Sequence, residues 1–313
     1  MTLTQLEYIV AVDTHRSFAE AASSCGVTQP TLSMQIKKLE EELEILVFDR
    51  TKKPVLTTDM GKEIVVQARK TLSEASHIQQ LISERKGEVR GELKLGIIPT
   101  LSPYLLPLFM LSFLEKYPQV NIVVEELVSE EIIERLHQDQ LDVGLLVTPL
   151  KRKALIETPL FYELFVVYVS SNHPLNSRVK LDFRELNLEE MWLLKEGHCF
   201  RNQVINICGE QAHSGNERLR FESGSLETLR RIVDQQYGYT LLPELATLDM
   251  GQEQYKNIKH FKNPQPVREV SLVRHRNFFK AHLIQLLESE IKAGVPDILH
   301  NPQRGKLIDW ELE

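Results

Sequence analysis

The stretch Ser17-Phe18-Ala19-Glu20-Ala21-Ala22-Ser23-Ser24-Cys25-Gly26-Val27-Thr28-Gln29-Pro30-Thr31-Leu32-Ser33 decides the fold of the N-terminal third. It begins with a serine followed three positions later by a glutamate, a capping box that predicts a short helix over 19–25. Gly26-Val27 predicts a tight turn, and Pro30 suits the first turn of the next helix, where its missing N–H costs nothing. Two helices joined by such a turn predict a helix-turn-helix, whose second helix enters the DNA major groove.

The second helix of this motif carries side chains that suit DNA. Amides and hydroxyls read base edges, and lysine contacts phosphate. The expected contacts on this helix are Gln29, Thr31, Ser33, Gln35 and Lys38. Residues 48–57 predict a small β wing with three cations at the DNA backbone or minor groove, namely Arg50, Lys52 and Lys53. On these residues alone, a small helical bundle with a solvated polar face remains the alternative.

Regular patterns extend on both sides of this motif. Thr2 and Gln5 form another capping box, which predicts a first helix. Beyond the wing, apolar residues recur at three- and four-residue steps over 58–85, and they are Ile64, Ala68, Leu72, Ala75, Ile78, Leu81 and Ile82. A narrow apolar stripe on a helix of about 28 residues predicts pairing with a second copy, so that two DNA half-sites are read together. Gly87 and Gly91 predict a hinge.

Strands and helices alternate in the C-terminal two thirds, which predicts a parallel sheet covered on both faces. The first strands are expected at 92–98, 121–128 and 141–147. The first helices are expected at 104–117 and 130–138. Thr100 and Ser129 follow the first two strands, at the edge where such sheets bind ligands, although each could simply cap the next helix. Later strands include 219–222, and the chain returns to the first lobe through 268–273. The tail after Pro296 has no strong pattern.

Two of the three cysteines lie in the segment Lys195–Cys208. Cys199 stands between His198 and Arg201, and a neighbouring cation favours the thiolate, the form that attacks peroxides and disulfides. An acidic, reactive Cys199 is therefore expected. Two unrelated buried cysteines, each packing as a small apolar side chain, are the alternative, and Cys25 is expected to be buried in this way.

Cys208 follows Cys199 by nine residues, across a segment whose apolar residues predict a helix. On a helix this separation is about 13 Å, whereas a disulfide needs Cα atoms roughly 4.4–6.8 Å apart. The two sulfurs therefore cannot bond unless the segment refolds, which is a property of a switch.

The composition sets the class of protein. The chain has 313 residues, a formal net charge of −7 and three cysteines, which favours a reducing compartment and a cytoplasmic location. The N-terminus lacks signal-peptide features, and no apolar run is long enough for a membrane span. The sequence predicts no cofactor and no metal site. The negative charge argues only weakly against DNA binding, because the position of the cations matters more.

Residues 1–85 resemble the winged helix and linker helix of LysR-type transcriptional regulators, through Ser17–Ala22, Val27–Ser33 and Leu43–Arg50. The resemblance implies an α/β chain with a winged helix-turn-helix (1–58), a linker helix for dimerisation (59–86), a hinge (87–91) and a regulatory domain (92–313). The regulatory domain is expected to be periplasmic-binding-protein-like, with lobe I over 92–162 and 268–295, lobe II over 163–267, and a ligand site in the cleft.

Gly197–Gln203, with Cys208 downstream, resembles the peroxide-sensing members of this family. In those proteins hydrogen peroxide oxidises a first cysteine, and a second cysteine then forms a disulfide with it. By position, the first corresponds to Cys199 and the second to Cys208. Four residues align with those that position peroxide or support the thiolate in these proteins: Thr100, His198, Arg201 and Arg268. Ser129 stands where a threonine is usual, and Asn202 where an aspartate is usual. The second difference removes a carboxylate.

The resemblance implies a non-enzymatic activator of oxidative-stress genes. Its expected partners are double-stranded DNA, RNA polymerase, hydrogen peroxide as the signal, glutathione or glutaredoxin as reductant, and further copies of the chain in a homodimer or homotetramer. One alternative is a metabolite-responsive LysR regulator with structural cysteines, which a Cys199 pKa near or above about 8.5 would favour. The other is a thiol peroxidase, against which the helix-turn-helix argues.

Overall fold

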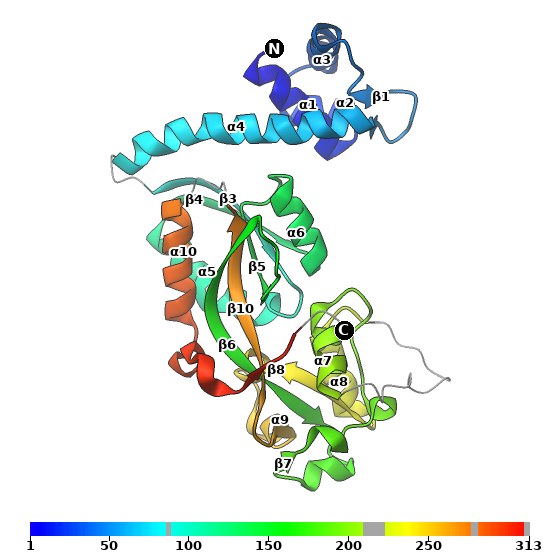
Figure 1. The fold of residues 1–313 in the computed structure, drawn as a ribbon, viewed down its shortest axis with the longest axis vertical. Helices are drawn as coiled ribbons and strands as arrows, with labels where there is room; N and C mark the ends of the chain where they lie inside the picture. The colour runs from blue at the N-terminus through cyan, green and yellow to red at the C-terminus, as the bar shows by residue number, and fades with distance from the viewer. Residues whose placement is uncertain (86–88, 209–222, 277–280, 310–313) are drawn as a thin grey trace. The chain divides into compact units, whose positions relative to one another are not determined.

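A computed structural model describes residues 1–85, 89–208, 223–276 and 281–309 (Figure 1). The chain forms two compact units, whose main boundary lies between Val89 and Arg90; the short segment His137–Gln140 is grouped with the first unit. Residues 87 and 88 of the expected hinge and the strand expected at 219–222 lie outside the described residues. Among the described helices, none has the length and apolar character needed to cross a membrane.

Unit 1 is a helix-turn-helix followed by a β wing and a long helix. Its elements are α1 (Leu3–His15), α2 (Phe18–Ser24), α3 (Gln29–Leu43), β1 (Phe48–Asp49), β2 (Leu56–Thr57) and α4 (Asp59–Arg85). Thr2 and Gln5 form the predicted capping box of α1, and the Ser17 hydroxyl caps α2 by accepting the backbone N–H of Glu20. Strands β1 and β2 pair antiparallel, which confirms the wing.

The core of unit 1 joins all of its helices. It includes Leu6, Ile9, Val12, Ala21, Leu32, Ile36, Leu39, Phe48, Val65 and Ala68. Burial of one large apolar side chain contributes roughly 1.5–3 kcal/mol, so these contacts hold the first half of α4 against α1 and the wing. Farther along α4, Ile78 is 64% exposed. The first half of the apolar stripe of α4 is therefore buried in the core of unit 1. In the second half, Ile78 is exposed.

Unit 2 is built on one sheet with the strand order β4-β3-β5-β10-β6-β9-β7, in which β11 also pairs with β10 and β8 with β6. Its strands are β3 (Arg90–Ile97), β4 (Gln119–Glu126), β5 (Val143–Thr148), β6 (Leu155–Val169), β7 (Lys180–Leu181), β8 (Tyr239–Pro243), β9 (Ile258–Phe261), β10 (Pro266–His275) and β11 (Lys306–Leu307). Its α-helices are α5 (Ser102–Lys116), α6 (Ser129–His137), α7 (Cys199–Cys208), α8 (Leu226–Gln235), α9 (Gln252–Tyr255) and α10 (Ala281–Gly294).

Strands β3, β4 and β5 are parallel, as predicted. The prediction of a wholly parallel sheet is wrong, because β10 runs antiparallel to both β5 and β6. The chain leaves the first lobe along β6 and returns along β10, so these two neighbouring strands must run in opposite directions.

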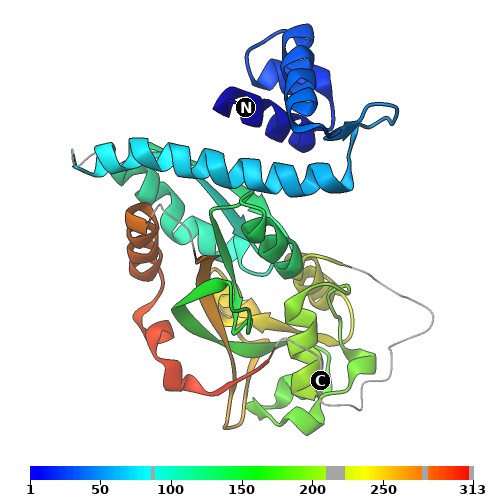
Figure 2. The ribbon, with the colours of Figure 1, turned by 45° about the horizontal axis from the view of Figure 1, so that its top comes forward.

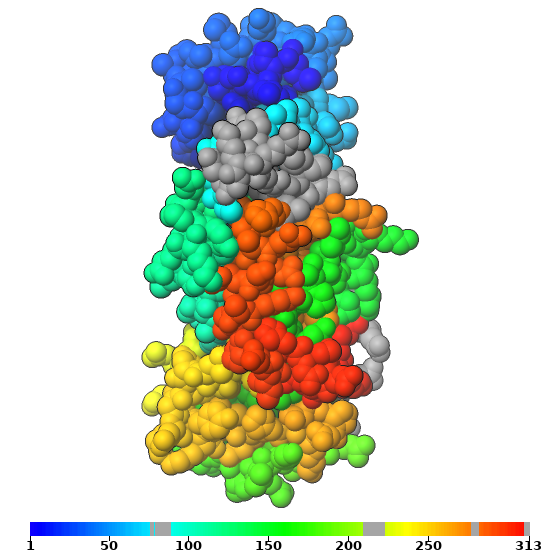
Figure 3. Space-filling model, turned by 90° about the vertical axis from the view of Figure 1, so that its left-hand side faces the viewer, coloured from blue at the N-terminus to red at the C-terminus, as the bar shows by residue number. Residues whose placement is uncertain are grey.

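Strands β6 and β10 extend through both halves of unit 2 (Figures 1 and 2). We call the half built on β3, β4 and β5 lobe I, and the half that carries α7 and α8 lobe II. After α10 the chain continues through two short 3-10 turns, Asp297–His300 and Pro302–Arg304, before β11. Figure 3 shows α10 and this continuation as one orange-to-red strip along the surface of unit 2. The pairing of the tail with β10 was not predicted.

Candidate functional site

Cys199 is the first residue of α7, and only 5% of it is exposed. Burial raises the pKa of its thiol. Three features oppose this effect by stabilising the thiolate: the Ser129 hydroxyl, the positive charge of Arg268 and the backbone N–H groups of Cys199 and Phe200 at the helix start. The resting site therefore holds a neutral thiol beside groups that favour its ionised form.

Arg268 is fully buried on β10 and is held by an ion pair and by Thr100. Its Nε donates to Glu163 Oε1 at 2.8 Å, and Glu163 faces it directly across the β6–β10 register. Its Nη1 donates to the Thr100 hydroxyl at 3.0 Å, and its Nη2 to the Thr100 carbonyl at 3.1 Å. The guanidinium also lies 5.1 Å from the centre of the Phe200 ring. These contacts fix the cation between lobe I and the start of α7.

Thr100 and Ser129 lie at the carboxyl ends of the adjacent strands β3 and β4, as predicted. Neither hydroxyl caps a helix. The Thr100 hydroxyl accepts from Arg268, and the Ser129 hydroxyl is buried with no well-aligned hydrogen-bond partner among the described residues. Ser129 is close enough to the sulfur to lower the pKa of Cys199. A buried hydroxyl without a bond is costly, so this one is available to a small polar ligand.

The expectation of an acidic Cys199 is wrong, because burial raises the pKa of its thiol. Burial and the charge of Lys195 lower the pKa of His198, so its imidazole is neutral near pH 7. Arg201 Nη1 donates to the Leu194 carbonyl at 3.0 Å, and its charge is not among the causes of the Cys199 pKa shift. The cation whose charge lowers the pKa of Cys199 comes from β10, as Arg268.

Cys208 ends α7, at the helical separation from Cys199 that the sequence predicted, about 13 Å from a rise of ~1.5 Å per residue. Both cysteines are free thiols. Burial raises the pKa of Cys208 to about 12. The described structure is thus a dithiol form in which the helix keeps the two sulfurs apart. Asn202, also on α7, is half-buried.

Glu163 is the residue that sequence reasoning missed. It is fully buried, binds Arg268, and accepts the backbone N–H of Leu245 at 3.0 Å. A signal was present, because Glu163 is the single charged residue in the apolar run Leu160–Val169. A buried carboxylate needs a buried cation, and that requirement pointed to Arg268.

On α3, Gln29, Thr31 and Lys38 are exposed, as are Lys52 and Lys53 in the wing. Ser33 and Gln35 are half-buried. Arg50 has contacts within the unit, since Nη2 pairs with Glu40 at 2.7 Å and Nη1 donates to Ser33 at 3.2 Å. Arg50 therefore anchors the wing to α3. Its predicted contact with DNA is a separate role.

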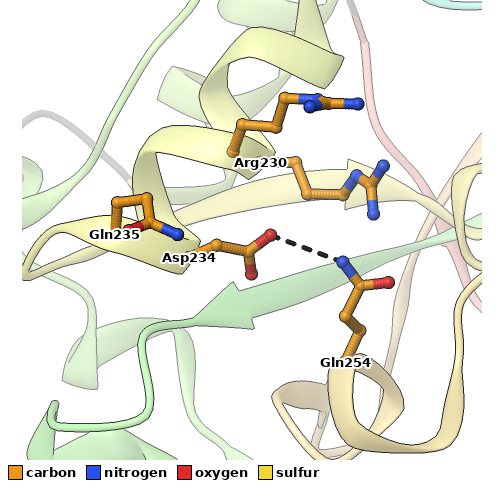
Figure 4. A pocket seen from close by; sticks show the side chains of 5 residues that line it. Arg230, Asp234, Gln235 and Gln254 are labelled. Atoms are coloured by element: carbon orange, nitrogen blue, oxygen red, sulfur yellow. Dashed lines mark hydrogen bonds between the residues drawn. The ribbon is translucent and has the colours of Figure 1, made fainter.

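A separate hollow of about 300 Å³ lies on lobe II (Figure 4). Arg230, Asp234 and Gln235 reach it from α8 and Gln254 from α9, and Gln254 donates to Asp234. Arg230 is already paired with Glu227, which accepts the Tyr104 hydroxyl of lobe I at 2.9 Å. This hollow lies apart from Cys199. Among the described residues, no group of three or more His, Cys, Asp or Glu could hold a metal ion.

Two family models match the chain: "Bacterial regulatory helix-turn-helix protein, lysR family" over residues 3–62 and "LysR substrate binding domain" over residues 86–294. The chain belongs to the LysR family. It is therefore a DNA-binding transcriptional regulator by family, with a helix-turn-helix and an α/β regulatory domain as predicted.

Several curated relatives of similar sequence carry names that concern peroxide. A "Hydrogen peroxide-inducible genes activator" of Haemophilus influenzae is 38% identical, over 87% of this chain and 90% of the relative. The Escherichia coli "DNA-binding transcriptional dual regulator OxyR" is 36% identical, over 87% of this chain and 89% of the relative.

Solved structures of OxyR proteins are similar to this chain as well. A full-length OxyR variant from Pseudomonas aeruginosa has a TM-score of 0.79 and 35% identity, and the match covers 93% of this chain and 98% of that one. A hydrogen-peroxide-bound OxyR mutant from Corynebacterium glutamicum has a TM-score of 0.61 and 26% identity, over 94% of this chain and 92% of that one. The chain is thus similar to OxyR proteins, in agreement with the resemblance to peroxide-sensing members that its sequence indicated.

Proposed function

We propose that this LysR regulator senses hydrogen peroxide through Cys199 and responds by activating transcription of oxidative-stress genes. One observation carries the proposal: a buried thiol at a helix start lies beside a fixed buried cation, Arg268, and beside the buried Ser129 hydroxyl, which has no other hydrogen-bond partner among the described residues. Peroxide is a small molecule that needs hydrogen-bond partners for two oxygens and a stabilised leaving group. The named relatives support the same function.

In the first step the Cys199 sulfur attacks one peroxide oxygen. The S–O bond forms as the O–O bond breaks, so Cys199–SH and H₂O₂ give Cys199–SOH and water. The thiol proton joins the departing hydroxide. Ser129 and Thr100 would hold the second peroxide oxygen, and Arg268 would stabilise the hydroxide as it leaves. His198 and Arg201 would support the loop before α7.

In the second step the Cys208 thiol attacks the sulfenic acid, and a Cys199–Cys208 disulfide and water are formed. This requires unwinding of α7, because the helix separates the sulfurs by about 13 Å. The refolded segment would repack lobes or protomers and so alter promoter contacts. Two molecules of glutathione, directly or through a glutaredoxin, would restore both thiols and leave glutathione disulfide.

The rest of the chain would connect this switch to DNA. The winged helix (1–58) would read an operator through the exposed residues of α3 and the wing, the linker helix (59–86) would pair copies, and the regulatory domain (92–313) would report peroxide. A homotetramer in the cytoplasm, in contact with RNA polymerase and without enzymatic turnover, is the form we propose.

The raised pKa of Cys199 is the one observation that favours the alternative, a metabolite-responsive regulator with structural cysteines. Its effector would bind in the inter-lobe cleft. Two observations weigh against it. A purely structural cysteine gives no reason for a buried cation and a buried hydroxyl whose only neighbour for hydrogen bonding is the sulfur, and the relatives are named for peroxide.

The test compares Cys199→Ser and Cys208→Ser with the unchanged protein after sub-stoichiometric peroxide. Mass spectrometry should find a Cys199–Cys208 bond only in the unchanged protein, and a trapped sulfenic acid in Cys208→Ser. Cys199→Ser should lose promoter activation. Full peroxide induction in Cys199→Ser would refute the proposal, and sustained multiple-turnover peroxide consumption would favour a peroxidase.

A further inference from the structure

The C-terminal tail joins the regulatory sheet beside the site. Residues 306–309, which we call the strap, add β11 in parallel to β10, with Lys306 opposite Pro266 and Leu307 opposite Val267. The Lys306 N–H donates to the Gln265 carbonyl at 2.8 Å, and the Ile308 N–H to the Val267 carbonyl at 2.9 Å. The strap is thus fixed next to Arg268 in the β10 strand.

The other side of the strap binds α7. The Gln203 Nε2 donates to the Ile308 carbonyl at 3.0 Å, and the Asn206 Nδ2 to the Asp309 carbonyl at 2.9 Å. Gln203 and Asn206 are three residues apart, so they lie on one face of the helix. Gln203 is fully buried, which makes its bond costly to lose. Figures 1 and 2 both show the red strap running from β10 to α7.

Gln203 and Asn206 both lie between Cys199 and Cys208 in the sequence of α7. A disulfide requires this part of α7 to unwind, and unwinding moves Gln203 and Asn206 away from carbonyls that β10 holds in place. The strap contacts therefore belong to the helical dithiol form.

We propose that the strap holds α7 in its helical form, with Gln203 and Asn206 as positioning residues, and that it thereby sets how readily the cysteine pair is oxidised. The redox part of this inference rests on the proposed function. Contacts made only by the dithiol form favour that form, so their loss favours the disulfide. Two hydrogen bonds of ordinary net strength shift such an equilibrium about tenfold, which is about 30 mV for a two-electron couple.

Gly305 allows a test that changes no atom of α7. A Cβ at this residue would lie 2.1 Å from the Gln265 carbonyl oxygen, so Gly305→Ala should push the strap off β10. The backbone of Gly305 is extended, and alanine adopts that conformation without strain. Gly251→Ala is the matched control, because a Cβ there meets open space.

In Gly305→Ala, amide hydrogen exchange of α7 in the reduced full-length protein should rise about tenfold relative to Gly251→Ala. The midpoint potential of the cysteine pair, measured in glutathione buffers, should become more negative by about 30 mV. Gln203→Met removes the buried donor with little change in volume and should shift both readings the same way. The double variant should add little to Gly305→Ala, because the bond that Gln203→Met removes is already broken when the strap leaves β10.

Wild-type exchange and potential in both Gly305→Ala and Gln203→Met would overturn the proposal. So would a potential shift toward easier reduction. If no variant forms a disulfide with any oxidant, the peroxide proposal fails, and α7 exchange in the reduced protein still decides whether the strap holds the helix.

Discussion

At the scale of single residues, two opposing effects act on Cys199. Removal from water disfavours the thiolate, while Ser129, Arg268 and the N-terminus of α7 favour it, and burial prevails in the raised pKa. The sensor would then be quiet at rest, since peroxide must enter before the stabilising groups act on a developing charge. This arrangement suits a signalling thiol, which must not react with every oxidant in the cell.

The raised pKa predicts a specific pH dependence. Below its pKa, the ionised fraction of a thiol grows about tenfold for each pH unit. The second-order rate constant for Cys199 oxidation in a Cys208→Ser protein should therefore rise about tenfold per unit between pH 6 and pH 8, with no plateau. Stopped-flow measurement with a sulfenic-acid probe checks this. A rate that is already constant at pH 7 would mean that Arg268 and Ser129 outweigh burial, contrary to our interpretation.

At the scale of elements, the crossing strands β6 and β10 bring the charge to the site. Glu163 and Arg268 face each other in register, and neither side chain is exposed. Burial raises the pKa of Glu163 while the guanidinium opposes that shift, and we interpret the pair as ionised because Arg268 remains charged. Two strands that connect the lobes thus also position the cation that acts on Cys199.

Glu163→Gln should leave Arg268 buried without its counter-charge. Loss of one partner of a buried ion pair costs about 3–5 kcal/mol, and we expect a loss of that size in the unfolding free energy of unit 2. Urea denaturation measures it. Glu253→Gln is the control, since the exposed pair of Glu253 with Lys256 contributes only about 0–1 kcal/mol. A cost for Glu163→Gln as small as that of the control would show that the carboxyl group is already neutral.

What the sequence could predict follows from the range of each interaction. The caps at Thr2 and Ser17, the wing, α7 and the positions of Thr100 and Ser129 are encoded within a few residues, and each was found. The Glu163–Arg268 pair joins positions 105 residues apart, and the strap bonds join positions up to 105 apart. No local pattern records such partners. The acidic Cys199 expected from its neighbours in sequence was wrong because burial, which adjacency along the chain does not reveal, raises the pKa of the thiol.

At the scale of the whole molecule, α4 would pair copies of the chain and α3 would contact DNA, so the number of paired copies sets the number of DNA contacts. The first half of α4 is part of the unit 1 core, whereas Ile78 farther along is exposed, which supports pairing of copies through the far half. Each copy on an operator would present its own exposed Lys38 to the phosphates. Phosphate contacts release counterions, so the logarithm of affinity falls with the logarithm of salt by about 0.9 per contact.

The change in this salt slope counts the copies on DNA. Lys38→Ala removes one cation per copy, so the slope should fall in magnitude by about 1.8 for a bound dimer and about 3.6 for four bound copies, the latter being our expectation for a tetramer. Affinities for a full operator between 50 and 300 mM salt provide the measurement. Lys256→Ala removes another exposed cation, one that lies on lobe II, and should leave the slope unchanged. An unchanged slope in Lys38→Ala would exclude Lys38 as a phosphate contact, and a change near 0.9 would mean that a single copy binds, against the pairing that the exposed Ile78 supports.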